Sequence, residues 1–357
     1  MATSLAPNPL TYVHPPGLTM RSEWYGDNTY HRMHVYKNAT SLVDGNPWVV
    51  FRHPGSWLFF DKTGQFESPT NNPPHLILAA WLLDNTYGNV APPFTLFSFS
   101  TRQIRHSSIG GYVPAQPYEP TIGNGAFPRP GVISRPAFGR AYVDDAQRVV
   151  QHIKDNATLY GIDPERGNAW GSSAGASATG AAALSATRAY SASGLVPNLP
   201  MHDSYVRSWI NWIGPIDFRP SYMDIGITAP LFGLIDTFGS ATQLAQAQAL
   251  LQRAGSTDPS PLCTSISPRH LAPLADLKAR KTRILSVYDK NNAAGSNPFT
   301  DPHDWRQSAD QKAACGPLGI SYQELLPHLV TDFGGDRQLM WESTLVPTYA
   351  HLVASNA

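Results

Sequence analysis

The segment from residue 142 to residue 187 most constrains the fold of this chain, because it alternates a helix, a strand, a sharp turn and a second helix. Apolar residues recur at helical spacing from residue 142 to residue 160, at Val143, Ala146, Val149, Val150 and Ile153. Residues 168–170 predict a short strand, Gly171 to Gly175 a turn, and residues 176–187 a helix of small residues. Strands that alternate with helices indicate an α/β fold with a mainly parallel sheet.

The remaining patterns extend this fold along the whole chain. Further strands are predicted at residues 23–25, 34–36, 48–52, 94–99, 206–213, 283–288 and 322–326, and further helices at 75–83, 241–253 and 305–314. Residues 101–138 are rich in Gly, Pro and Ser and predict a long irregular excursion. Residues 219–262 have the character of an inserted segment.

Composition excludes several classes of protein. Lys plus Arg and Asp plus Glu both number 26 in 357 residues, so the basic excess of a nucleic-acid-binding protein is absent. The hydrophobic fraction of 42% and the charged fraction of 15% exclude a disordered chain. The longest apolar run, residues 76–83, is too short to span a membrane. We therefore expect a globular protein with no membrane span, whose oligomeric state the sequence leaves open.

The cysteines and the first residues bear on the cellular compartment. Cys263 and Cys315 form either one disulfide or two buried thiols, because sequence distance says nothing about geometry. The first seven residues show no signal peptide, which fits a cytoplasmic protein and equally a mature exported form. The many prolines and tryptophans favour export, but the compartment stays open.

The sharpest chemical signal is Gly-x-Ser-x-Gly at residues 171–175. Between a strand and a helix this motif forms a nucleophile elbow, in which the glycines relieve crowding around a strained serine. Ser173 is the predicted nucleophile, and the N–H of the next residue, Ala174, points toward a developing oxyanion. The alternative is a glycine-rich helix start that only packs tightly against the sheet.

The chain resembles the α/β-hydrolase esterases of the hormone-sensitive-lipase and acetyl-esterase branch. The residues that carry this resemblance are Asp144-Asp145, the segment 160–166 (Tyr-Gly-Ile-Asp-Pro-Glu-Arg) and the motif at 171–175. The resemblance implies one domain over residues 1–357, with an eight-stranded, mostly parallel sheet and a cap or insertions at about 101–138 and 219–262. It also implies hydrolysis of carboxylic esters by a Ser-His-Asp triad, without a cofactor or metal.

The resemblance places the oxyanion loop of the family at His53-Pro54-Gly55-Ser56-Trp57, where the family has His-Gly-Gly-Gly. Carried over, the oxyanion donors are the backbone N–H groups of Gly55, Ser56 and Ala174. Proline has no N–H, but Pro54 occupies a position whose N–H is not needed. The alternative is an ordinary turn at the end of a strand, which His-Pro-Gly also suits. Trp57 follows this loop and is a candidate contact for an acyl or aryl group.

The acid and the base should follow the nucleophile in the order Ser, acid, His. Asp289, Asp301 and Asp304 are the acids beyond the strand at 283–288. Asp301, in Thr-Asp-Pro before a helix, resembles the acid turn of the family and is the preferred acid. Asp289 lies nearer the strand end and stays the alternative.

The histidines after these acids are His303, His328 and His351. His303 is too close to Asp301 in the chain to bridge it to Ser173. His351 lies on the predicted terminal helix, where we expect a surface or packing histidine with its hydrogen bonds satisfied. His328 follows the strand at 322–326, where the histidine loop of the family lies, although the flanking glycines of the family are missing. His328 is therefore the predicted base.

A second group of residues gives a weaker indication of a functional site. His31 and His34 have a metal-like spacing, but no carboxylate or cysteine supports them, so we interpret them as surface residues. The sequence predicts a serine carboxylesterase acting on a small or polymeric ester. A peptidase or amidase on the same fold and a non-catalytic binding protein are the alternatives.

Overall fold

A computed structural model of the chain describes residues 18–26, 31–38, 44–52, 94–101, 141–184, 203–218, 242, 267–271, 274–288, 304–326, 344 and 346–356. The predicted helices at 75–83 and 241–253 (Thr242 apart) lie outside these described residues. So do the excursion at 101–138 beyond Thr101 and the segment at 219–262.

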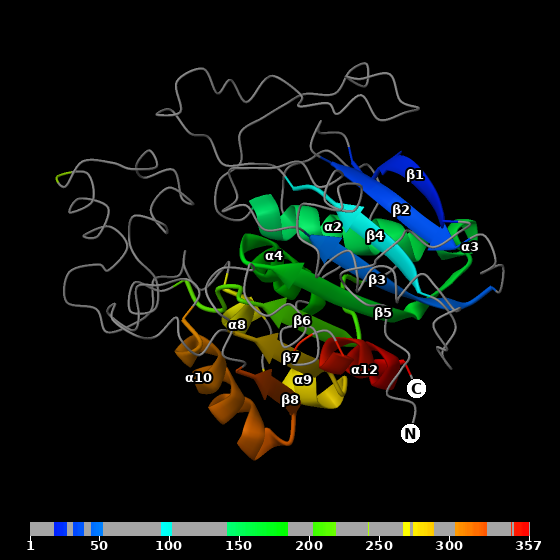
Figure 1. Cartoon of the computed structure of the whole chain (residues 1–357). Helices are drawn as coiled ribbons and strands as arrows, with labels where there is room; N and C mark the ends of the chain where they lie inside the picture. The colour runs from blue at the N-terminus through cyan, green and yellow to red at the C-terminus, as the bar shows by residue number, and fades with distance from the viewer. Residues whose placement is uncertain are drawn as a thin grey trace, which may run out of the picture.

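Eight strands form one sheet in the order β1-β2-β4-β3-β5-β6-β7-β8 (Figure 1). Their bounds are β1 Leu18–Trp24, β2 Arg32–Asn38, β3 Asn46–Arg52, β4 Thr95–Phe99, β5 Ile162–Ser172, β6 Ser208–Trp212, β7 Arg283–Val287 and β8 Ser321–Leu325. The β1–β2 and β2–β4 pairs are antiparallel, and every other pair is parallel. All eight predicted strands are present, so the expectation of an eight-stranded, mostly parallel sheet is confirmed.

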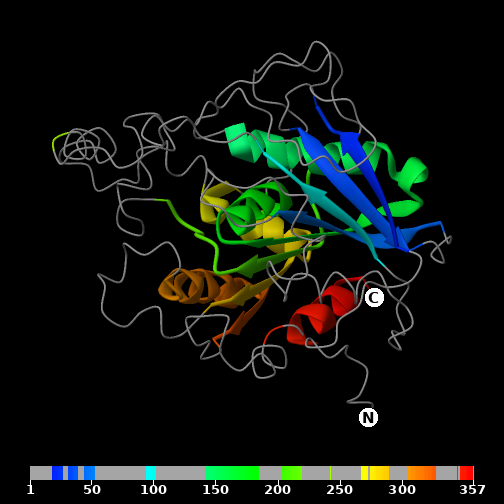
Figure 2. The same ribbon diagram turned by 45° about the horizontal axis from the view of Figure 1, so that its top comes forward.

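Helices cover both faces of this sheet. Their bounds are α2 Ala141–Asp155, α3 Ala157–Tyr160, α4 Ala174–Leu184, α8 Pro268–Leu271, α9 Leu274–Ala279, α10 Arg306–Cys315, the 3-10 helix η2 Gly316–Leu318 and α12 Val346–Ser355. Figure 2 shows α2 and α4 on one side of the sheet and the red α12 on the other. Among the described residues no helix has the length and apolar character needed to cross a membrane.

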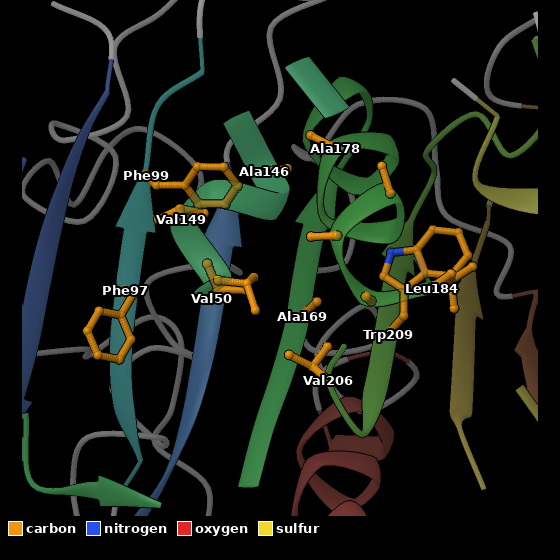
Figure 3. Packing of buried hydrophobic residues seen from close by; sticks show 14 of the residues in the cluster. Val50, Phe97, Phe99, Ala146, Val149, Ala169, Ala178, Leu184, Val206 and Trp209 are labelled. Carbon is orange, nitrogen blue, oxygen red and sulfur yellow. The ribbon is translucent and has the colours of Figure 1, made fainter. Parts of the chain in front are cut away.

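The core lies between the sheet and the pair α2 and α4, as the side chains in Figure 3 show. All eleven residues of α4 are buried, and all except Thr179 and Leu184 are Ala, Gly or Ser. Small residues are needed there because a Cβ on Gly180 would come within 2.5 Å of the Trp209 ring. The indole N–H of Trp209 donates to the Ala176 carbonyl oxygen (3.1 Å), which fixes α4 against β6.

Two predicted boundaries need correction. The strand predicted at 168–170 begins at Ile162, because Asn46 of β3 pairs with Ile162 before the register shifts. Residues 163–166 form the extra length on β5 between the pairs Asn46–Ile162 and Trp48–Gly167, so the turn residues Asp163 and Pro164 lie within the strand as an irregularity. The helix predicted over 142–160 divides at Asn156 into α2 and α3.

The end of α3 follows the prediction. Gly161 adopts a left-handed conformation with φ of 62°, and its N–H donates to the carbonyl oxygens of the last turn. Glycine is the residue that reaches this conformation without steric cost. The chain therefore reverses at Gly161 and enters β5 directly, which leads it to the motif at 171–175.

Candidate active site

Ser173 lies in a sharp turn between β5, which ends at Ser172, and α4, which begins at Ala174. Its φ is 53°, a left-handed conformation that is uncommon for a residue with a side chain. The Ser173 N–H donates to the Trp212 carbonyl oxygen (2.9 Å), and its own carbonyl oxygen accepts from Ala176 N–H (3.0 Å). These bonds hold a strained serine at the carboxyl end of a central strand, the conformation that the elbow prediction requires.

Ser173 is also the point at which this segment meets solvent. From Gly167 to Leu184 every residue is buried except Ser173, which is half-buried. Its neighbour Ala174 begins the helix, and the first N–H groups of a helix have no intrahelical acceptor. These N–H groups also carry the positive end of the helix dipole. The turn therefore presents a hydroxyl beside backbone donors that favour negative charge.

Gly171 is the residue of the motif for which the structure requires glycine. A Cβ at this position would lie 2.5 Å from the Gly175 carbonyl carbon and oxygen and 2.6 Å from the Ala176 nitrogen. All three atoms are backbone, so they cannot move aside as a side chain can. The close approach of strand and helix is what makes the turn at Ser173 so short.

We expect Gly171→Ala to lower the free energy of unfolding by at least about 2 kcal/mol, because the new methyl group overlaps backbone atoms of α4. Gly316→Ala is the matched control: a Cβ there meets nothing within 4 Å, and its φ of −54° suits alanine. That control should be neutral or raise stability by about 0.4–1 kcal/mol. Urea unfolding of both variants measures the difference, and equal stabilities would contradict the close approach at Gly171.

The turn that follows β6 packs directly against Ser173. A Cβ on Gly214 would lie 2.8 Å from the Ser173 carbonyl oxygen and 2.3 Å from the Ala176 Cβ. The buried side chain of Asn211 accepts from Gly214 N–H (2.7 Å) and donates to the Gly214 carbonyl oxygen (3.1 Å). The Tyr288 hydroxyl also donates to that carbonyl oxygen. Sequence reasoning missed this support, for which the only sequence signal was Gly214-Pro215 after a strand.

Three residue pairs between neighbouring strands define the edge of the sheet at which the predicted triad would lie. Ser172 pairs with Trp212, Trp212 with Val287, and Val287 with Leu325. The carboxyl ends of β5, β6, β7 and β8 therefore lie level with one another. Ser173 follows this row by one residue.

The described residues hold only part of the predicted site. Ser173 and Ala174 are adjacent at the elbow, as described above. The predicted oxyanion loop with Gly55, Ser56 and Trp57, the acids Asp289 and Asp301, and the histidines His303 and His328 lie outside the described residues.

Asp304, the third acid considered from sequence, is described and has a structural role. Its side chain is fully buried, and the Arg306 guanidinium donates to both carboxylate oxygens (Nε to Oδ1 2.9 Å, Nη2 to Oδ2 2.6 Å). The Arg306 backbone N–H donates to Oδ1 as well (2.9 Å). Asp304 therefore binds Arg306, the first residue of α10, through both its side chain and its backbone.

His351 lies on α12 and is buried, with 4% of its surface exposed. Thr348, one turn earlier on α12, accepts from the indole N–H of Trp212 (3.3 Å), which places this helix on the sheet face opposite α4. Among the described residues His351 Nε2 has no hydrogen-bond partner, and burial lowers the pKa of the imidazole to about 4. His351 is therefore a packing residue and not a surface residue, and the expectation that its hydrogen bonds are satisfied is wrong for Nε2.

The neutral burial of His351 predicts acid sensitivity. Because its folded pKa lies below the unfolded value of 6.5, the neutral imidazole must take up a proton on unfolding in acid. His351 should therefore remove about 3 kcal/mol of stability as the pH falls from 6.5 to 4, and nothing above pH 6.5. His351→Leu should lose less stability than the parent between pH 7 and pH 4 in urea unfolding; equal losses would contradict a neutral buried His351.

A buried polar cluster lies beside the carboxyl end of β3. Arg52 Nε donates to Thr101 Oγ1 (3.1 Å), and burial lowers the pKa of Arg52 to about 10.

His31 Nε2 lies 2.9 Å from Asp145 Oδ1, with both side chains buried. The interpretation of His31 and His34 as surface residues is therefore wrong, because α2 supplies Asp145 to His31 and β2 lies between β1 and β4. Among the described residues no group of three or more His, Cys, Asp or Glu could hold a metal.

Cys315 carries a free thiol, buried at the end of α10, and burial raises its pKa to about 11. The thiol therefore stays protonated, as expected for a small apolar core residue. Cys263 lies outside the described residues.

Solved structures that share this fold include several esterases. Over 95% of this chain and 96% of the other, the structure matches esterase 2 of Thermogutta terrifontis phosphonylated by sarin, with a TM-score of 0.55 and 14% identity. It matches a truncated carbohydrate esterase from gut microbiota over 96% and 99% of the two chains (TM-score 0.53, 16% identity). It also matches an inhibited esterase B of Lactobacillus rhamnosis over 96% and 90% (TM-score 0.52, 13% identity). No protein-family model and no curated protein matches the chain. At these identities the matches establish a shared fold.

Proposed function

We propose that this chain is a serine carboxylesterase with the α/β-hydrolase fold, similar to the hormone-sensitive-lipase and acetyl-esterase branch. The observation that carries the proposal is Ser173: a left-handed, half-buried serine between a central parallel strand and a helix, in a fold shared with esterases. A serine is held in this strained conformation when the surrounding structure over-determines it, which is characteristic of catalytic sites.

His328 is the proposed base. It follows Leu325 by three residues, and Leu325 lies level with Ser172, three strands away. Three strand spacings amount to about 14 Å. Three extended residues span at most about 10 Å, so the imidazole has only the remaining few ångströms to cover. The level row of strand ends therefore supports His328 as a residue within reach of Ser173.

Asp301 is the proposed acid, with Asp289 as its alternative. Asp301 precedes α10, which begins at Arg306, by five residues. Gln307 of α10 accepts from the N–H groups of Ile216 and Asp217 (3.0 and 3.3 Å). Since Ile216 and Asp217 follow β6 at its carboxyl end, the start of α10 lies at the edge that holds Ser173. Asp289 directly follows Tyr288, which contacts Gly214 at the same edge.

The proposed reaction uses these groups in two steps. Ser173 Oγ attacks the ester carbonyl carbon while His328 takes the hydroxyl proton, and Asp301 stabilises the imidazolium. Gly55, Ser56 and Ala174 N–H groups bind the oxyanion, and its collapse expels the alcohol, which receives the proton from His328. Water, deprotonated by His328, then attacks the acyl carbon; the bond to Ser173 Oγ breaks, Oγ takes the proton back from His328, and the acid is released. Trp57 would contact the apolar part of a small or polymeric ester.

A panel of substrates tests this function. We expect hydrolysis of p-nitrophenyl esters of rising chain length and of an aryl acetate, and at least about 10²-fold slower cleavage of the matching anilide, because an amine leaving group needs stronger protonation. Faster anilide cleavage would favour a peptidase or amidase. No turnover of any substrate by the folded protein would favour a binding protein.

A further inference from the structure

Ile213 has a backbone conformation that its own residue type disfavours. Three residues other than glycine have positive φ among the described residues: Ser173 (53°), Ile213 (48°) and Lys281 (55°). Lys281 follows α9, and its N–H donates to the Lys278 carbonyl oxygen (3.0 Å), so its conformation is that of an ordinary helix end. Ile213 follows a strand, and for a β-branched residue a positive φ is a genuine outlier.

A dense set of hydrogen bonds holds Ile213 in this conformation. Its N–H donates to the Val287 carbonyl oxygen on β7 (2.8 Å). The next residue, Gly214, is bound at both its N–H and its carbonyl oxygen by the Asn211 side chain. Asn211 Nδ2 also donates to the hydroxyl of Tyr288 (3.0 Å), and burial keeps that phenol protonated by raising its pKa. The conformation is therefore imposed by buried groups around it.

The strained conformation places Ile213 beside the proposed nucleophile. Its two chain neighbours both contact Ser173: the Trp212 carbonyl oxygen accepts from Ser173 N–H (2.9 Å), and a Cβ on Gly214 would lie 2.8 Å from the Ser173 carbonyl oxygen. From Ser208 to Phe218 every residue is buried except Ile213. Its side chain packs partly on the core and is partly exposed, like Ser173 itself.

We propose that Ile213 is a specificity-determining residue that forms an apolar wall of the substrate site. This inference rests on the proposed function and adds the class of substrate: an ester with an apolar group on one side of the scissile bond. Glycine or asparagine would adopt the same backbone conformation with less strain. A branched apolar side chain at such a position costs stability, and strain of this kind is characteristic of functional sites.

The test compares Ile213→Gly with Lys281→Gly, because both variants remove a side chain from a left-handed residue and only Ile213 lies beside Ser173. kcat/KM is measured for p-nitrophenyl esters from acetate to hexanoate and for acetates of alcohols from methanol to hexanol. In Ile213→Gly the loss should grow with chain length in one of the two series, to about tenfold more for the longest ester than for the shortest. The series that responds identifies the acyl or the alcohol side.

Three further results bound the interpretation. Ile213→Val should retain most of the chain-length preference, and Lys281→Gly should match the parent on every ester. An equal loss on all esters in Ile213→Gly, or an unchanged preference in both series, would overturn the wall while leaving the esterase proposal intact. A parent protein that hydrolyses no ester would end both proposals. Thermal unfolding confirms that each variant is folded before its kinetics are compared.

Discussion

Replacing Ser173 by alanine should lower kcat/KM for ester hydrolysis by at least about 10³-fold, to the residual that substrate binding and the oxyanion donors provide. The reason is that no other group at the elbow can form the acyl-enzyme: Ser172 is buried in the strand, and Ala174 has no nucleophile. The initial rate on p-nitrophenyl butyrate measures the effect. The variant should stay folded, because alanine differs from serine by one oxygen.

Ser177→Ala is the matched control for this experiment. Ser177 lies one turn along the same helix, is fully buried, and donates from its hydroxyl to the Pro215 carbonyl oxygen (2.6 Å). Its removal should lower stability by about 1 kcal/mol and change kcat/KM by less than about tenfold. Activity retained in Ser173→Ala would refute the assignment of Ser173 as the nucleophile. Equal losses of activity in both variants would indicate damage to the helix instead.

His328→Ala should lower activity as much as Ser173→Ala, because residues that act as one unit in catalysis give similar losses when either is removed. His351→Ala is the control, since it deletes a buried imidazole on the sheet face opposite α4 and should change kcat/KM by less than about tenfold. Full activity in His328→Ala would disprove the proposed base. A large loss of activity in His351→Ala would assign the role of base to His351, provided that thermal unfolding shows the variant to be folded.

Measuring kcat/KM for two further variants identifies the acid of the triad. Asp301→Asn should lower kcat/KM by about 10³-fold or more, because it removes the carboxylate that stabilises the imidazolium. Asp289→Asn should cost under about tenfold. The reverse pattern would assign the acid to the end of β7 and leave the nucleophile and base unchanged.

Local sequence patterns predicted the sheet and the elbow, because both features depend on residues that are close together in the chain. The buried run at 48–52 is mostly apolar in its own composition, and Gly161 follows the last helical residue of its segment. The close approach at Gly171 likewise follows from a motif of five consecutive residues.

Features set by tertiary contacts could not be predicted in this way. Nothing in the sequence near Ile213 indicates a positive φ, because its conformation is imposed by Val287, Asn211 and Tyr288. The burial of His31 depends on Asp145, which is 114 residues away in the chain. The extension of β5 back to Ile162 depends on its pairing with Asn46. In each case a distant partner overrides the local preference.

The most direct test of the central claim is to treat the folded protein with a fluorophosphonate and map the adduct by peptide mass spectrometry. Only a serine activated by a base beside oxyanion donors reacts readily with this reagent. The proposed site predicts one adduct per chain, located on the peptide that contains Ser173 and absent from Ser173→Ala. An adduct on another serine, or no adduct on a protein shown to be folded, would contradict the assignment of Ser173 as the nucleophile.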